Sequence, residues 1–257
     1  MKCKKLNALR YTKEAVEKPY LTQLETIGEF EVWDVDGMYV RSKLNREFTN
    51  FGQHFRFPFI PKYQFWIDHE NASDETAFYV EHMLLEWTLM SQGINYDTAI
   101  ARADHKEQKE RRKSALMAKV SKELTASLKT IPKEVYVHRL TDSASPQIWI
   151  INGELVRDLF FIDFTEGGHH FVYDFVPVNE VWLDNDLVPA EREFVLLHEL
   201  HERYLMFTGW TYVHAHNSSS YIEYQCRHKP SLLSANLTKA MAANALIGST
   251  AAAAHNR

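Results

Sequence analysis

The chain has 257 residues, 45% of them hydrophobic, and its formal net charge of −5 gives no overall drive towards nucleic acid or an anionic membrane. Its two cysteines are too few for a disulfide framework or a cysteine-based metal knuckle, which favours a reducing compartment. The basic N-terminus is not followed by an apolar segment, and no run of about 18 apolar residues occurs, so we expect a soluble, cytoplasmic protein.

The chain repeats itself at an offset of 116 residues. Trp33–Gly37 matches Trp149–Gly153, and His82–Glu86 matches His198–Glu202. Further pairs at this offset are Trp66 and Trp182, Gly93 and Gly209, and Tyr96 and Tyr212. We therefore predict an N-terminal repeat over 16–112, a helical linker over 113–131, a C-terminal repeat over 132–228 and a tail over 229–257.

Strands are predicted in the first half of each repeat. In the second repeat, Ile148–Ile151 and Glu154–Val156 flank the dipeptide Asn152-Gly153, which favours a tight β-hairpin turn. Asp36-Gly37 occupies the same place in the first repeat and predicts the same turn.

Later segments of the second repeat complete an antiparallel meander. His170–Val176 alternates like a half-buried strand, and Glu180–Asp184 returns as its partner after a turn. Together with Val135–Leu140 and the predicted hairpin, they indicate a sheet of roughly four antiparallel strands.

Two helices follow the strands in each repeat. In the second repeat, Pro189 is typical of a helix start and Gly209 of a helix end. Thr211 is a suitable N-cap for a second helix, which reaches about Arg227. The short connection predicts a helical hairpin packed on one side of the sheet, and hence an α+β fold.

The remaining segments are connectors. His105 to Lys129 is rich in Lys and Arg and predicts a helix that leads from the first repeat to the second. Its basic face could contact phosphate, but a solvated linker helix is the favoured interpretation. From Ser231 onward the tail is rich in Ala, Asn and Ser, which indicates disorder or a frayed helix.

The second repeat carries ionisable side chains where the first has neutral ones. The pairs are Glu166 and Asn50, His169 and Gln53, Glu180 and Gln64, Glu199 and Met83, His201 and Leu85, and His216 and Ile100. We interpret the second repeat as the one that carries a functional site, and the first as a copy that kept the fold but lost most of the ionisable side chains of that site. The alternative is drift between two surface patches.

The strongest candidate for a catalytic metal site is the segment His198-Glu199-Leu200-His201-Glu202. Residues four apart project from one helical face, so His198 and Glu202 can grip one ion. His216 on the next helix could supply a third ligand, which leaves a fourth position for water or substrate. Glu199 would lie beside the ion, where a carboxylate can take a proton from bound water.

These residues resemble the zincin metallohydrolases, whose helix carries H-E-x-x-H after an edge strand. The resemblance implies that His198 is a metal ligand and Glu199 the general base, with Glu202 in place of the family's second histidine. An anionic oxygen ligand there fits manganese or iron as well as zinc. The wider block from Gly167 to Glu199 also resembles uncharacterised proteins of phages and mobile elements, which implies a host cytoplasm as the setting.

Four residues are candidates for supporting roles: His169, His201, Glu223 and Glu166. Leu85 stands opposite His201, so His201 could be a packed histidine that supports a ligand. Glu223 could orient a ligand or form a plain inter-helix salt bridge. Because His82 and Glu86 keep the His198 and Glu202 pair, that pair could also be a structural hydrogen bond in both repeats.

The sequence therefore predicts a metal-dependent hydrolase with its active site in the second repeat. A divalent ion, zinc first and manganese or iron as alternatives, is the expected cofactor. The rival prediction is a non-catalytic binding protein of a phage or mobile element, in which both repeats dock a partner. The substrate class stays open between peptide, phosphodiester and small amide.

Overall fold

The computed structural model describes residues 18–114, 117, 131–141 and 146–255, and the chain divides into two units, residues 1–69 and 70–257. The unit boundary falls inside the first predicted repeat, so the helices of that repeat are grouped with the rest of the chain. Most of the predicted linker helix lies outside the described residues. Among the described residues, none of the helices has the length and apolar character needed to cross a membrane.

The described residues of the first unit, 18–69, form a four-stranded mixed sheet and one helix. Its elements are β1 (Tyr20–Ile27), β2 (Phe30–Val35), α2 (Gly37–Lys43), β3 (Phe51–Gln53) and β4 (Gln64–Asp68). The strand order is β1-β2-β4-β3, and only the central pair, β2 and β4, is parallel. Trp33 lies opposite Trp66 in that parallel pair. One side of the sheet packs on a core that includes Val40 and Phe48.

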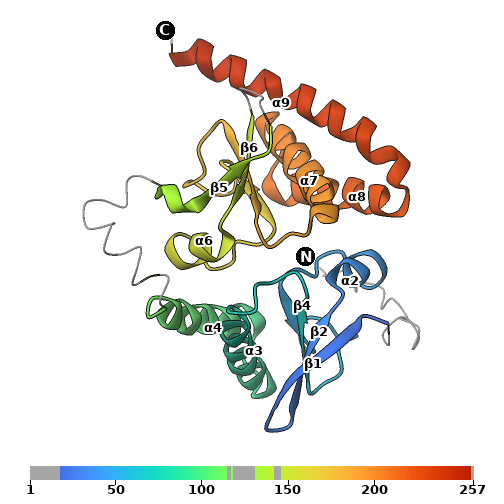
Figure 1. Cartoon of the computed structure of the whole chain (residues 1–257), viewed down its shortest axis with the longest axis vertical. Coiled ribbons are helices and arrows are strands. Elements are labelled where there is room, and N and C mark those ends of the chain that lie inside the picture. Colours follow the sequence, from blue (N-terminus) through green and yellow to red (C-terminus); the bar gives the residue numbers. More distant parts are fainter. Residues whose placement is uncertain (1–17, 115–116, 118–130, 142–145, 256–257) are drawn as a thin grey trace. The chain divides into compact units, whose positions relative to one another are not determined.

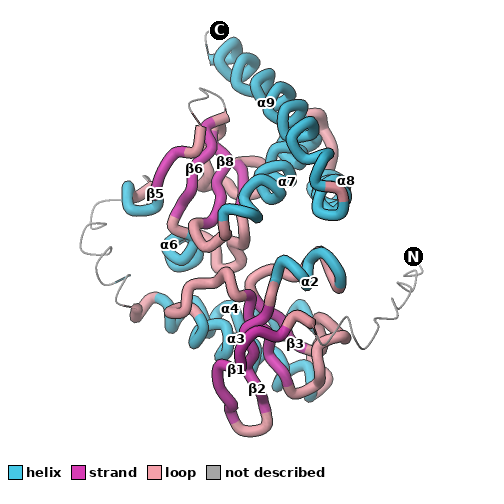
Figure 2. The backbone as a smooth tube through the Cα atoms, turned by 45° about the vertical axis from the view of Figure 1, so that its right-hand side comes forward, coloured by secondary structure: helices cyan, strands magenta, loops and turns pink. Residues whose placement is uncertain are grey.

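Residues 70–257 begin with a helical hairpin and continue with a second sheet and further helices. The elements are α3 (Thr76–Ser91), α4 (Tyr96–Arg111), η1 (Lys133–Val135), β5 (Tyr136–Arg139), β6 (Gln147–Ile151), α6 (Gly153–Leu159), β7 (Gly167–His169), β8 (Glu180–Asp184), α7 (Pro189–Phe207), α8 (Tyr212–His228), η2 (Pro230–Leu232) and α9 (Leu233–His255). Strand order is β5-β6-β8-β7, with β6 and β8 parallel and Trp149 opposite Trp182. Figure 2 shows β5, β6 and β8 as neighbouring strands.

The predicted hairpin turns are wrong in both repeats. Asn152 is instead the N-cap of α6, because its side-chain oxygen accepts a hydrogen bond from the backbone N–H of Leu155 at 2.8 Å. Asp36 caps α2 in the same way, through the N–H of Tyr39. The glycine that follows is needed for space, since a Cβ at Gly153 would overlap the carboxylate of Asp184.

The antiparallel meander is also wrong, because each sheet has a parallel pair at its centre. His170–Val176 forms turns, and the N–H groups of Val172 and Tyr173 both donate to the carbonyl of His169. The ring of Phe175 packs beside Trp182. The apolar residues of this segment therefore join an aromatic cluster instead of a strand ladder. The α+β class itself is confirmed.

The predicted helical hairpin of the second repeat is present as α7 and α8. Helix α7 packs against β7 and β8 on one side and against α8 and α9 on the others (Figure 1). The tail, for which disorder or a frayed helix was expected, forms helix α9. Arg203 of α7 donates to the side-chain oxygen of Asn244 at 2.6 Å, and Asn244 donates to the carbonyl of Leu200. This buried network fixes α9 on α7.

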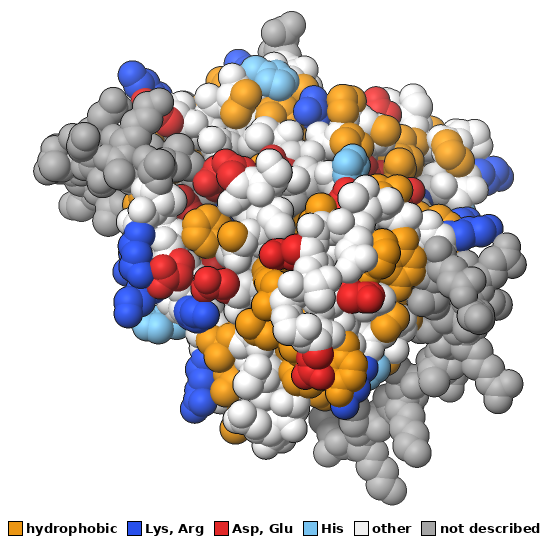
Figure 3. Space-filling model, turned by 60° about the horizontal axis from the view of Figure 1, so that its bottom comes forward, with side chains coloured by type: hydrophobic (Ala, Val, Ile, Leu, Met, Phe, Trp, Pro, Cys, Tyr) orange, Lys and Arg blue, Asp and Glu red, His pale blue; other side chains and the backbone are white. Residues whose placement is uncertain are grey.

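On the face shown in Figure 3, acidic, basic and apolar side chains lie interspersed. Among the exposed large apolar residues are several on and around α8: Trp210, Tyr212, Val213, Tyr221 and Tyr224.

Candidate metal centre

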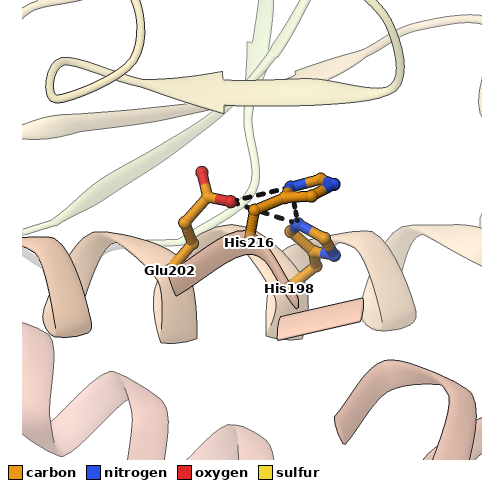
Figure 4. A group of neighbouring side chains, drawn as sticks. All are labelled: His198, Glu202 and His216. Atoms are coloured by element: carbon orange, nitrogen blue, oxygen red, sulfur yellow. Dashed lines mark hydrogen bonds and ion pairs between the residues drawn. The ribbon is translucent and has the colours of Figure 1, made fainter. Parts of the chain in front are cut away.

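Three predicted ligands converge between α7 and α8. His198 and Glu202 point from α7 towards His216, which comes from α8 (Figure 4). Nε2 of His198 lies 3.2 Å from Nδ1 of His216, and Oε2 of Glu202 lies 2.9 Å from that Nδ1. Oε2 of Glu202 is 3.5 Å from Nε2 of His198. Three ligand atoms thus share one point, at which they could hold a metal ion.

The spacing of these atoms fits a tetrahedral ion. Bonds of about 2.0–2.1 Å hold neighbouring ligands of a tetrahedron about 3.3–3.4 Å apart. The three observed separations, 2.9, 3.2 and 3.5 Å, bracket that value. Glu202 is buried, whereas His216 is partly exposed, so the cluster is open to solvent on the side of α8.

Glu223 fixes the ring of His198 in a state suited to binding metal. Nδ1 of His198 lies 2.9 Å from Oε2 of Glu223, so the Nδ1–H group donates to the carboxylate. Nε2 is then the ring nitrogen that could bind an ion, once that ion displaces its proton. Glu223 is held in turn by Arg227 at 2.8 Å, and Arg227 donates to Glu191 at 2.6 Å. Burial opposes a charge on His198, but its bonds to Glu202 and Glu223 raise its pKa well above the ordinary value.

Glu199 and His169 lie on the other side of Glu202. Ligand atoms of these three residues are within 4.8 Å of one another, and all three residues are buried. Nε2 of His169 is 3.2 Å from Oε1 of Glu202. Burial, reinforced by the negative charge of Glu202, raises the pKa of Glu199 to about 8. A cation beside Glu199 would favour its ionised form, the form that a general base needs.

The other candidates separate into those near the site and those outside it. Glu166 has the only positive φ, 57°, of any non-glycine residue in the described chain, and its charge contributes to the raised pKa of Glu199. His201 is in neither group of possible ligands, and its Nε2 lies 3.1 Å from the hydroxyl of Ser218. Glu180 accepts hydrogen bonds from Tyr136 and Trp182 at the sheet.

Helices α3 and α4 contain the same supporting network without the three-ligand cluster. Nδ1 of His82 lies 2.8 Å from Glu107, which binds Arg111 at 2.7 Å, and Arg111 binds Glu75 at 2.8 Å. Glu86 is 3.7 Å from Nε2 of His82. Ile100 stands at the sequence position that corresponds to His216 and has no ligand atom. The His–Glu–Arg–Glu network is therefore structural in at least one hairpin.

Two members of that network, Glu191 and Arg227, were not among the predicted site residues. The offset of 116 residues could have found them, since it pairs Glu75 with Glu191 and Arg111 with Arg227. A search for ligand residues does not find a salt bridge between helices, because neither Glu191 nor Arg227 belongs to the three-residue cluster.

Comparison of the chain with protein families, with curated proteins and with solved structures found no match.

Proposed function

We propose that this protein is a metal-dependent hydrolase with one divalent ion held by His198, Glu202 and His216. Zinc is the first candidate, and manganese and iron are the alternatives that an oxygen ligand admits. The observation that carries the proposal is the triangle of 2.9, 3.2 and 3.5 Å between two imidazole nitrogens and a carboxylate oxygen. Three protein ligands leave a fourth position for water or substrate.

The residues around the cluster suit hydrolysis. A divalent ion here would acidify a water molecule in the fourth position. Glu199 lies on the same helix one residue after His198, and its carboxylate would accept the proton of that water and pass it to the leaving group. Glu223 would keep Nε2 of His198 directed at the ion by accepting from Nδ1–H.

The N-terminal half of the chain is proposed to be a pseudo-copy in a tandem duplication. Both sheets have the same strand order and the same placement of their tryptophan pairs, which supports this origin. Both helical hairpins have the His–Glu–Arg–Glu network. Met83 and Ile100 occupy the positions of Glu199 and His216, so the first copy would bind no ion.

The second candidate function is a non-catalytic binding protein, as in an accessory protein of a phage or mobile element. Its support is the recurrence of the network in α3 and α4, which shows that His82, Glu107 and Arg111 serve a hairpin without three ligands. Under this alternative, His198 and Glu223 would likewise only join α7 to α8.

Metal content separates the two candidates. The wild-type protein and the variants His198→Ala and His82→Ala should be purified in parallel and analysed by elemental mass spectrometry after dialysis against trace zinc. The hydrolase proposal predicts about one ion per chain for wild type and His82→Ala, and a loss of that ion in His198→Ala. An ion-free wild type, or equal loss in both variants, contradicts it.

A further inference from the structure

The two oxygens of Glu202 face different partners. Oε2 faces His216 and His198, whereas Oε1 lies 3.2 Å from Nε2 of His169. Glu202 and His169 are buried, with 3% and 0% of their surfaces exposed. His169 thus has one of two roles: it could be the ligand of a second ion that Glu202 bridges, or it could hold Glu202 in place.

The backbone decides between these roles. The N–H group of Phe171 lies 3.3 Å from Nδ1 of His169, and an N–H group can only donate. Nδ1 therefore offers its lone pair, and a neutral imidazole must carry its proton on Nε2. A protonated Nε2 cannot bind a metal ion, but it lies 3.2 Å from Oε1 of Glu202, close enough to attract the carboxylate electrostatically although the two groups are not aligned as a hydrogen bond.

In the first sheet, Gln53 occupies the position that corresponds to His169, and a glutamine side chain does not titrate. Gln53 ends β3 as His169 ends β7, and its Oε1 accepts from the N–H of Phe55 at 2.8 Å. With Oε1 committed to the backbone, the distal group of Gln53 is an N–H donor. Glutamine thus provides the same acceptor for the backbone and a distal N–H group, but it offers no imidazole nitrogen to a metal.

We propose that His169 is a positioning residue: it anchors Oε1 of Glu202, so that Oε2 alone faces the ion and the centre holds one ion. The inference rests on the proposed metal centre. A carboxylate without this anchor would have to be ordered when the ion binds, and loss of such outer partners commonly weakens metal affinity by about 10- to 100-fold.

The test is a competitive zinc titration that gives affinity and stoichiometry for four proteins: wild type, His169→Ala, His169→Gln and, as a nearby histidine outside the cluster, His201→Ala. We expect one zinc per chain throughout. His169→Ala should bind about 10- to 100-fold more weakly. His169→Gln and His201→Ala should stay within a few-fold of wild type.

Two results of the titration overturn the inference. Wild-type affinity in His169→Ala shows that Glu202 needs no anchor. Two zinc ions in wild type, with one lost in His169→Gln, make His169 a ligand of a second ion. If wild type binds no zinc, the proposed function fails, and the inference fails with it.

A second measurement does not depend on metal binding. Nitrogen-15 NMR of the imidazole side chains in chelator-treated protein should find the proton of His169 on Nε2. A proton on Nδ1 alone would overturn the inference and leave the proposed centre intact. Should His169→Ala not fold, as judged by its thermal transition, His169→Gln and the NMR signal decide.

Discussion

Nε2 of His198 lies 3.2 Å from Nδ1 of His216, although the two residues come from different helices. Nδ1 of His216 also lies 2.9 Å from Oε2 of Glu202, and a carboxylate can only accept, so Nδ1 of His216 carries a proton when no ion is bound. An ion bound here would replace that proton. The nearby carboxylate of Glu202 favours a cation at the same point. On the opposite side of the His198 ring, Glu223 accepts a hydrogen bond from Nδ1–H.

The first prediction concerns Glu223, which contacts Nδ1 of His198. Glu223→Gln keeps the shape of the side chain but removes the charge that makes His198 a stronger ligand, so zinc affinity should fall by about 10-fold or more. The matched control is Glu107→Gln, which makes the same change beside His82. Competitive titration with a zinc indicator measures both. An equal effect of the two variants would show that the loss comes from weakened helix packing.

The second prediction concerns Glu199 in ion-free protein. Its pKa is raised to about 8, mainly by burial, from an ordinary value of 4.5. The folded state therefore holds a proton that the unfolded state has released, and stability falls as pH rises from 4.5 to 8. Glu199→Gln has no such proton to lose. Its free energy of unfolding, relative to wild type, should increase between pH 5 and pH 8 in urea titrations with chelator present.

A constant difference between the two proteins over that range would place Glu199 in a solvated setting and remove it as the general base. With zinc present, Glu199→Gln should retain the ion, and any hydrolysis should fall by about 100-fold or more. Met83, at the matching position of the first repeat, indicates that a neutral side chain is compatible with the helix.

The third prediction concerns Glu202, for which the pH dependence of stability is opposite to that for Glu199. Burial tends to raise the pKa of Glu202, but its bonds with His169, His198 and His216 outweigh burial and lower it below the ordinary 4.5. A depressed carboxyl pKa stabilises the fold above the unfolded value and loses that contribution as pH falls. Ion-free Glu202→Gln should therefore be less stable than wild type at pH 6, with the gap narrowing as pH falls from 4.5 towards 3. A gap of the same size at pH 6 and at pH 3 would mean that the carboxylate charge contributes nothing.

The helical hairpin and strand β8 could be predicted from the sequence because their signals are local. Pro189, Gly209 and the apolar spacing between them define α7 without reference to the rest of the chain. The same local logic placed His198 and Glu202 on one face of a helix, four residues apart, and the structure brings His216 to them across the hairpin.

The sheet could not be predicted in this way, because its arrangement depends on distant partners. Asn152-Gly153 is a strong hairpin signal in the sequence, but an asparagine can also cap a helix. What decides is the carboxylate of Asp184, which fills the space beside Gly153 and binds Arg157 of α6 at 2.6 Å. Likewise, the parallel pairing of β6 with β8 is a long-range choice that no single segment encodes.

The central claim is that one ion is bound by His198, Glu202 and His216, and X-ray absorption at the zinc edge tests it most directly. Zinc-loaded wild type should give a four-coordinate shell of nitrogen and oxygen with two imidazoles. His216→Ile, which introduces the residue found 116 positions earlier at Ile100, should lose one imidazole or the ion itself while keeping the thermal transition of ion-free wild type. A shell with unchanged imidazole scattering in that variant, or one that contains sulfur, would contradict the account.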